Sequence, residues 1–156
     1  MKYMSSLFIL VVCALSGCAA TNSQKKYGDL PLSEGAFNKS SFSELNRFPP
    51  RYPERAAKNS EEGCATVEYV VTPDYEIEDI KVVSATKHYF ATSAKQVVQN
   101  WKWAEISSKE LDKPIKVMTR FEFCLNESDF ICSDQKLSSA CPGQDVIYSV
   151  GSAIIR

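Results

Sequence analysis

Four cysteines are the residues with the clearest chemistry in this chain: Cys64, Cys124, Cys132 and Cys141. In an exported protein, four cysteines favour two disulfides, whose pairing the count alone does not give. A metal site would need ligands at a spacing such as C-x-x-C, which the sequence does not contain, and the single histidine, His88, has no cysteine near it. The chemistry indicated is therefore oxidation to disulfides, and we expect no metal and no cofactor.

The first residues, MKYMSSLFILVVCALSGCAA, predict export to an oxidising compartment. Lys2 precedes an apolar run over residues 7–15, which is too short for a spanning helix of about 20 residues and is typical of a secretory signal peptide. The letters LSGC, residues 15–18, resemble the lipobox of bacterial lipoproteins. That resemblance implies cleavage before Cys18 and lipidation of Cys18. Because Ala19 and not Asp follows, it also implies anchoring at the periplasmic face of the outer membrane. The alternatives are an ordinary signal peptide with a chance cysteine, or an uncleaved anchor.

Composition limits the other classes of function. The formal net charge is −1, with charges of both signs, which argues against a nucleic-acid partner. Residues 19–46 are polar and rich in Ser and Asn, as in a tether with at most a few anchored aromatics, namely Phe37 and Phe42. The domain organisation predicted is a signal peptide (1–17), a flexible tether (18–47), a folded domain (48–125) and a C-terminal extension with disulfide cysteines (126–156).

The domain is predicted to be α+β, with three strands and two helices. The elements expected are a short helix at 54–59, strands at 64–72 and 76–86, an amphipathic helix at 89–103 and a strand at 115–125. The connection from the second strand through the helix to the third must be a right-handed crossover. The simplest sheet has the order 2-1-3, with one helix packed on one face and the other face largely wet.

This topology predicts a disulfide pairing. Cys64 begins the first strand and Cys124 lies near the end of the third, and alternation places both on the polar face. Because adjacent antiparallel strands bring those two ends together, we expect a Cys64–Cys124 disulfide, and by elimination a Cys132–Cys141 disulfide. The alternative is a free or reactive Cys64.

Residues 51–125 resemble the C-terminal domain of TonB, the periplasmic receptor-contacting module of energy transducers. The resemblance rests on an ordered set of motifs: YP at Tyr52–Pro53, G-x-x-x-V-x-Y-x-V-T-P-D from Gly63, IKVVSA at 80–85, WKW at 101–103 and TRFEF at 119–123. The chain departs from the family in its cysteines, in its tail after Leu125 and in its hairpin, where Tyr75 stands in place of a glycine. It also has a lipobox in place of the transmembrane helix and Pro-rich spacer of an energy transducer.

The resemblance implies a binding edge. In the sheet order 2-1-3 the third strand has an unpaired outer side, on which the family takes up receptor peptides by strand addition. The residues expected to flank such a partner are Lys116, Met118, Arg120 and Glu122. Two alternatives stay open. The charges of Lys116, Arg120 and Glu122 keep the edge from aggregating, or the apolar tail at 144–155 covers the edge within the same chain.

The function expected is a protein-binding module that contacts an outer-membrane receptor or another periplasmic protein segment, with a link to energy-dependent outer-membrane transport left open. The alternative is a structural envelope lipoprotein that keeps the fold without peptide binding or energy transduction. We expect neither an enzyme nor a small-molecule substrate. The chain has no G-x-S-x-G motif and no phosphate-binding loop. His88 is interpreted as a surface residue, and Trp101 and Trp103 as aromatics of the core and its rim.

Overall fold

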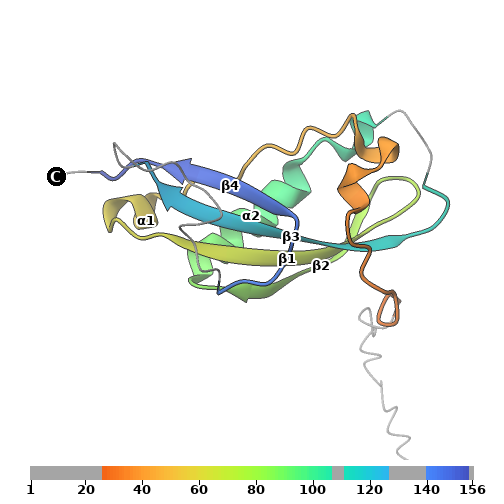
Figure 1. Ribbon diagram of the computed structural model, residues 1–156, viewed down its shortest axis with the longest axis horizontal. Coiled ribbons are helices and arrows are strands. Elements are labelled where there is room, and N and C mark those ends of the chain that lie inside the picture. Colours follow the sequence, from red (N-terminus) through yellow and green to blue (C-terminus); the bar gives the residue numbers. More distant parts are fainter. Residues whose placement is uncertain (1–25, 107–110, 127–139, 155–156) are drawn as a thin grey trace, which may run out of the picture.

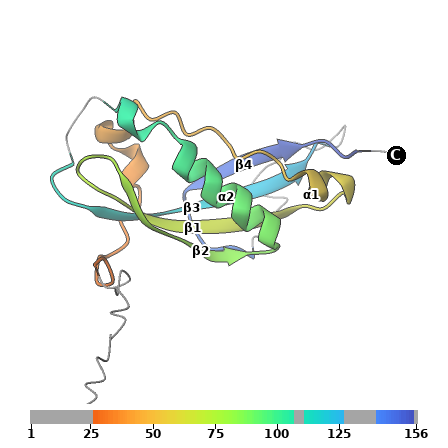
Figure 2. The ribbon, with the colours of Figure 1, turned by 180° about the vertical axis from the view of Figure 1, so that it is seen from behind.

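The computed structural model describes residues 26–106, 111–126 and 140–154. Its centre is one four-stranded sheet with the order β2-β1-β3-β4, crossed on one face by α2 (Figures 1 and 2). The elements, in chain order, are η2 (Ala36–Asn38), η3 (Ser40–Phe42), α1 (Glu54–Lys58), β1 (Gly63–Val71), β2 (Ile77–Ala85), α2 (His88–Asn100), η4 (Trp103–Glu105), β3 (Ile115–Leu125) and β4 (Val146–Gly151).

The first three strands confirm the predicted order 2-1-3. β1 pairs antiparallel with β2 on one side and with β3 on the other. The β1–β3 register runs without a break from Gly63 opposite Phe123 to Val71 opposite Ile115. By contrast, the β1–β2 pairing has two irregularities, and Asp79 in β2 has a positive φ of 47°. Bulges of this kind twist an edge strand and hinder pairing with other chains, so the β2 side of the sheet is protected.

The core lies between the sheet and α2. Phe90, Ala94 and Val98 of α2 are fully buried, at the i, i+4 spacing of an amphipathic helix. Trp101 and Trp103 are buried as well and their indole N–H groups donate to the backbone oxygens of Phe48 and Val98. Both tryptophans therefore belong to the core, within the prediction of core and rim aromatics. No helix among the described residues is long and apolar enough to cross a bilayer.

The structure corrects the three-stranded sheet. A fourth strand, β4, pairs with β3 in parallel over six residue pairs, from Arg120–Val146 to Leu125–Gly151. The expectation of a wet second face is also wrong, because Cys64, Thr66 and Glu122 on that face are 2 % exposed or less. The chain near Cys141 packs there, where the Thr66 hydroxyl donates to the Pro142 carbonyl over 2.6 Å.

The packed domain also begins earlier than predicted. Within the stretch expected to be a flexible tether, Ala36, Phe42 and Leu45 are buried in the core. Phe37 and Phe42 form an edge-to-face pair at 5.2 Å between ring centroids, so the expected anchoring of these two aromatics is confirmed. Short 3₁₀ turns and apolar residues spaced a few positions apart hold this segment against the sheet, although its Ser- and Asn-rich composition resembles that of a linker.

Candidate functional site

The outer edge of β3 is the candidate site, and its even-numbered residues direct their backbone groups outward. This direction follows from two hydrogen bonds: Ser33 N–H donates to Lys116 C=O (2.8 Å), and Arg120 N–H donates to Asp145 C=O (2.8 Å). Since backbone N–H and C=O groups alternate in direction along a strand, Met118 must point the same way. The edge therefore has three parts: Lys116 beside Leu32–Ser33, Met118 in the middle, and residues 120–125 beside β4.

β4 occupies the longest part of the edge. It comprises VIYSVG, without charge or proline, which suits a strand held inside a sheet. The chain arrives at β3 through Asp145 and leaves it through Gly151, whose carbonyl accepts the N–H of Asn126 at 2.8 Å. Beyond the strand, Ile154 N–H donates to the Ala57 carbonyl at the end of α1 (3.1 Å). The tail alternative raised by the sequence is thus realised: the edge is paired within the chain.

A polar cluster fixes the entry to β4. The Arg47 guanidinium binds both carboxylate oxygens of Asp145, with 2.9 Å between Nη1 and Oδ1. The Thr119 hydroxyl donates to Asp145 Oδ2 at 2.7 Å and also lies 3.0 Å from the Tyr69 hydroxyl. Arg47 in turn stacks on the Phe37 ring, 3.8 Å from its centroid. Burial raises the pKa of the Tyr69 phenol well above its usual value, with the Thr119 hydrogen bond acting in the opposite direction.

The segment before α1 runs along β4 and fixes its later residues. Ser149 is 2 % exposed and its hydroxyl donates to the Pro50 carbonyl at 2.8 Å. Gly151 lies against the Tyr52 ring, so closely that a Cβ at this position would be 2.5 Å from Cγ of the ring. The Tyr52 hydroxyl donates to the Glu61 carbonyl at 2.6 Å, which holds the ring in place. The residues just ahead of Tyr52–Pro53 are therefore part of the edge.

The middle of the edge is open. Among the described residues, none pairs with the outward backbone N–H and C=O of Met118. A hollow of about 390 Å³ lies beside it. The hollow is bounded by residues 32–38, by residues 143–146 and by Val117 and Met118. Backbone groups that lack a partner in the described part of the chain, at a partly exposed residue next to a hollow, give a point at which another chain can begin to pair.

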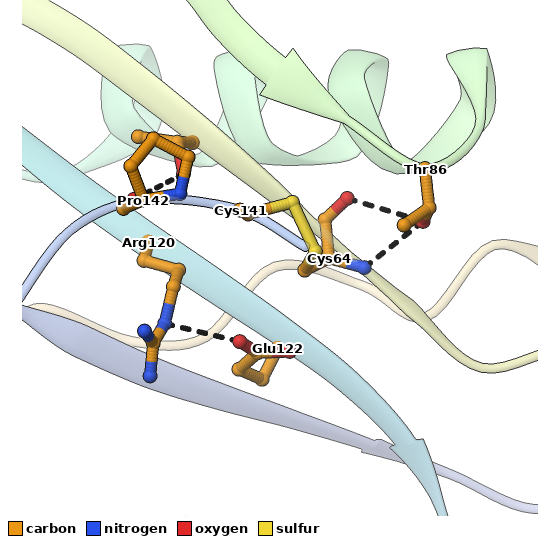
Figure 3. Close-up of a disulfide and its surroundings, with 7 residues drawn as sticks. Cys64, Thr86, Arg120, Glu122, Cys141 and Pro142 are labelled. Carbon is orange, nitrogen blue, oxygen red and sulfur yellow. Dashed lines mark hydrogen bonds and ion pairs between the residues drawn. A yellow bond between two sulfur atoms is a disulfide. The ribbon is translucent and has the colours of Figure 1, made fainter. Parts of the chain in front are cut away.

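The four residues predicted to flank a partner lie differently from one another. Lys116 is 8 % exposed beside Leu32, and Met118 borders the hollow. Arg120 and Glu122 form an ion pair on the second face, with 3.0 Å between Nε and Oε1, and Glu122 is only 1 % exposed (Figure 3). Met118 is itself the open position of the edge, whereas Glu122 is buried beside β4. The role of all four in binding stays a prediction.

One disulfide of the structure joins Cys64 to Cys141, with 6.0 Å between the Cα atoms (Figure 3). The predicted Cys64–Cys124 and Cys132–Cys141 pairings are therefore wrong. The face was predicted correctly, but the register places Cys64 opposite Glu122. Cys124 is then a diagonal neighbour at about 7–8 Å, beyond the usual Cα separation in a disulfide of about 4.4–6.8 Å. Cys124 is disulfide-bonded too, and the other cysteines, residues 13, 18 and 132, lie outside the described residues.

Several residues of the edge were missed by sequence reasoning. Arg47 and Asp145 are separated by almost a hundred positions, and nothing local marks either one. Gly151 carried a signal, because a glycine inside an apolar strand indicates close approach of another group. Cys18 and its lipidation lie outside the described residues. No group of three His, Cys, Asp or Glu side chains that could hold a metal occurs in the described part of the chain.

These observations define a small α+β module whose β3 edge pairs with an extended segment in parallel. A family model for the Gram-negative bacterial TonB protein C-terminal matches residues 49–125. This part of the chain therefore belongs to the TonB C-terminal domain family, whose members are protein-interaction modules of the bacterial envelope.

Solved structures of the same kind are similar to this chain. The solution NMR structure of the Pseudomonas aeruginosa TonB C-terminal domain is 25 % identical, with a TM-score of 0.43, over 50 % of this chain and 80 % of that one. The Helicobacter pylori TonB C-terminal domain is 22 % identical over 47 % and 77 %, with a TM-score of 0.39. The TonB2 protein from Vibrio anguillarum is 21 % identical over 78 % and 96 %, with a TM-score of 0.38. No curated protein sequence matches this chain.

Proposed function

We propose that this protein is a lipid-anchored, non-enzymatic module of the cell envelope that binds an extended segment of another protein by strand addition along β3. One observation carries the proposal: the β3 edge accepts a parallel strand over residues 120–125. The side chains of Arg47, Thr119 and Tyr52 and the backbone carbonyl of Pro50 contact the docked segment, residues 145–151. Backbone pairing of this kind supplies affinity in strand-addition complexes, and contacts to alternate side chains supply specificity.

A partner must take the place of β4, and the position of the disulfide permits this exchange. Cys141 is fixed to Cys64 a few residues before β4 begins, so β4 itself is held only by non-covalent contacts. The open backbone groups of Met118 lie directly ahead of the β4 pairing. A partner segment can pair there first and then displace β4 residue by residue, without breaking the disulfide.

The second candidate function is structural: an envelope lipoprotein in which β4 stays in place and no peptide binds. The burial of Ser149 and the tight seat of Gly151 against Tyr52 favour it, because both contacts are made only when β4 is docked. The two candidates differ in one measurable property, namely whether β4 leaves β3 in the presence of a partner.

The location belongs to the same proposal. Residues 1–17 are a signal peptide, Cys18 carries the lipid, and the outer-membrane periplasmic face is the destination. An outer-membrane receptor or another periplasmic protein is the partner, which would connect the module with transport across that membrane. In cells that express the chain with Cys18→Ser, we expect the protein in the soluble periplasmic fraction and no incorporation of labelled palmitate. Retention in the outer-membrane fraction contradicts the lipid anchor.

The test of binding is photo-crosslinking in cells from a benzoylphenylalanine at Met118. A probe at Gln96, which is exposed on α2, serves as the control. Strand addition predicts that Met118, and not Gln96, captures N-terminal or plug segments of outer-membrane receptors or segments of another periplasmic protein, identified by mass spectrometry. Capture of residues 140–154 of the same chain alone contradicts the binding function and supports the structural one.

A further inference from the structure

The contacts of β4 show which peptide the β3 edge recognises. We propose that the partner segment carries the alternating pattern Asp-x-Ile/Val/Leu-x-Ser-x-Gly, which the chain itself imitates from Asp145 to Gly151. This inference rests on the proposed function, since it assigns the chemistry of the partner at that same edge. β4 acts as a ligand bound within the chain, and the partner is a competitor that offers the same contacts.

The first subsite reads an acidic side chain. Asp145 receives two hydrogen bonds from Arg47 and one from the hydroxyl of Thr119. Arg47 is oriented for this contact by the rings of Phe37 and Trp101, whose centroids lie 3.8 and 5.1 Å from its guanidinium carbon. A planar guanidinium that binds two carboxylate oxygens discriminates strongly against an uncharged amide.

The next two subsites read an apolar and a small hydroxyl side chain. Ile147 lies opposite Phe121 and packs against the core cluster. Ser149 lies opposite the fully buried Phe123, and its hydroxyl has the Pro50 carbonyl as acceptor. A larger side chain at the Ser149 position would have to displace buried neighbours, because this position is 2 % exposed. A purely apolar one would leave the Pro50 carbonyl without this donor.

The last subsite accepts only glycine. Any Cβ at Gly151 would lie 2.5 to 2.7 Å from three atoms of the Tyr52 ring. The ring cannot move away easily, because its hydroxyl donates to the Glu61 carbonyl and the ring forms T-shaped pairs with Phe90 and Phe123. The Tyr52 ring therefore excludes every residue except glycine from the Gly151 position.

The even-numbered positions of β4 contribute little to the recognition of a partner. In a parallel pair, side chains of opposed residues share a face, so Val146, Tyr148 and Val150 lie on the second face with Arg120, Glu122 and Cys124. Val150 is 56 % exposed. A second copy of this chain also carries the pattern, but its β4 is already docked on its own β3. Exchange between two copies requires two docked β4 strands to leave β3, whereas a free segment of a different protein requires only one, which favours a different protein as the partner.

The experiment uses a fluorescein-labelled peptide, QDVIYSVGS, and the full mature chain with Cys18→Ser. Fluorescence anisotropy measures binding to this chain, to the same chain with Gly151→Ala, and to the matched control Val150→Thr. Because an Ala at position 151 weakens the internal strand, we expect the peptide to bind the Gly151→Ala chain at least about tenfold more tightly than the other two. Three further peptides, each with one replacement, test the pattern. The first has Asn in place of the aspartate, the second has Ala in place of the glycine, and the third has Thr in place of the second valine.

The expected order is a loss of about tenfold or more for the first two peptides, and a change within about twofold for the third. Equal binding of all four peptides overturns the pattern and leaves strand addition standing. No binding of any peptide to a Gly151→Ala chain whose β1–β3 amide resonances are native overturns both. Concentration-dependent dimers of that chain in place of peptide binding identify a second copy as the occupant and overturn the proposal.

A second measurement avoids the variant. In the chain without Gly151→Ala, hydrogen exchange should show that the Arg120 amide, which is bonded to Asp145, opens at least about tenfold more often than the amides that join β1 to β3. Equal protection of both sets would show that β4 leaves only on global unfolding, which contradicts displacement by a partner.

Discussion

The guanidinium of Arg47 binds the carboxylate of Asp145 through both terminal nitrogens and thereby joins the segment before α1 to the residue that leads into β4. Both side chains are partly exposed, at 18 % and 28 %. Their geometry, and not deep burial, makes the contact strong, because paired charge-assisted hydrogen bonds are stronger than neutral ones. This pair controls how firmly β4 stays on β3.

Arg47→Ala should lower the free energy of unfolding by about 1–3 kcal/mol, since it removes two charged hydrogen bonds and the stacking on Phe37. Arg47→Lys should lie between wild type and Arg47→Ala, because an ammonium cannot make the paired contact. Urea unfolding measures the effect, and Arg51→Ala, at an exposed position, is the control. An equal loss for Arg51→Ala would show that the pairing with Asp145 contributes nothing specific.

Disulfide mapping should recover one proteolytic fragment pair that joins Cys64 to Cys141. Cys141→Ser together with Cys64→Ser should lower the free energy of unfolding by about 4 kcal/mol in the chain-entropy model, because the bridge closes a long loop. Urea unfolding without reductant measures this loss. A fragment pair joining Cys64 to Cys124 would contradict the structure and restore the pairing expected from the sequence.

Gly63→Ala should destabilise the domain by about 1–3 kcal/mol through overpacking. A Cβ at Gly63 would lie 2.2 Å from the Thr86 hydroxyl and 2.6 Å from the Phe90 ring, where β1 begins beside α2. Gly28→Ala, at an exposed position, should change the stability by less than about 0.5 kcal/mol. Thermal unfolding of the two variants compares them, and equal melting temperatures would contradict the close packing at Gly63.

Stability should fall at alkaline pH because of Tyr69. Burial raises the pKa of its phenol in the folded state, so the folded chain keeps this proton after an unfolded chain has lost it. The contribution is fully present below the unfolded pKa of about 10 and is lost as pH rises towards the higher folded value. Above pH about 10 the free energy of unfolding should decline by up to about 1.4 kcal/mol per pH unit from this group.

Urea unfolding between pH 8 and 11.5 checks this decline. Tyr69→Phe should have a lower stability at pH 8, since the Thr119 hydrogen bond is lost, but a shallower decline above pH 10. Tyr52, whose pKa burial also raises, accounts for a remaining slope. An unchanged slope in Tyr69→Phe would show that its phenol does not resist ionisation.

The sequence predicted the parts of the fold that depend on local pattern. Period-2 alternation over residues 115–125 gave β3 with its bounds as found, and helical spacing of Phe90, Ala94 and Trp101 placed α2 within a few residues. Short connections and the crossover rule then gave the order 2-1-3. These signals work because the side chains that define them lie within one element.

What the sequence could not give depends on register and on distant segments. The predicted partner of Cys64 was wrong because a sequence pattern places a strand end only to within about two residues. An offset of two residues in the register between β1 and β3 decides whether Cys64 and Cys124 can form a disulfide. The coverage of the β3 edge could be raised as an alternative but not decided, since VIYSVG suits a docked strand and a free apolar tail equally well. Arg47, Pro50 and Tyr52 join the edge only through tertiary contacts.

The few residues between Cys141 and Val146 set a local concentration for β4 at its own docking site. A segment tied so closely to its acceptor is present there at an effective concentration of the order of millimolar or above. A dilute soluble peptide with the same contacts would therefore rarely displace β4 from β3. A partner held on the same membrane surface is confined to a thin layer and reaches comparable local concentrations. If a partner displaces β4 as proposed, the short span from the Cys64–Cys141 disulfide to β4 would favour partners held on the same membrane over dilute soluble peptides.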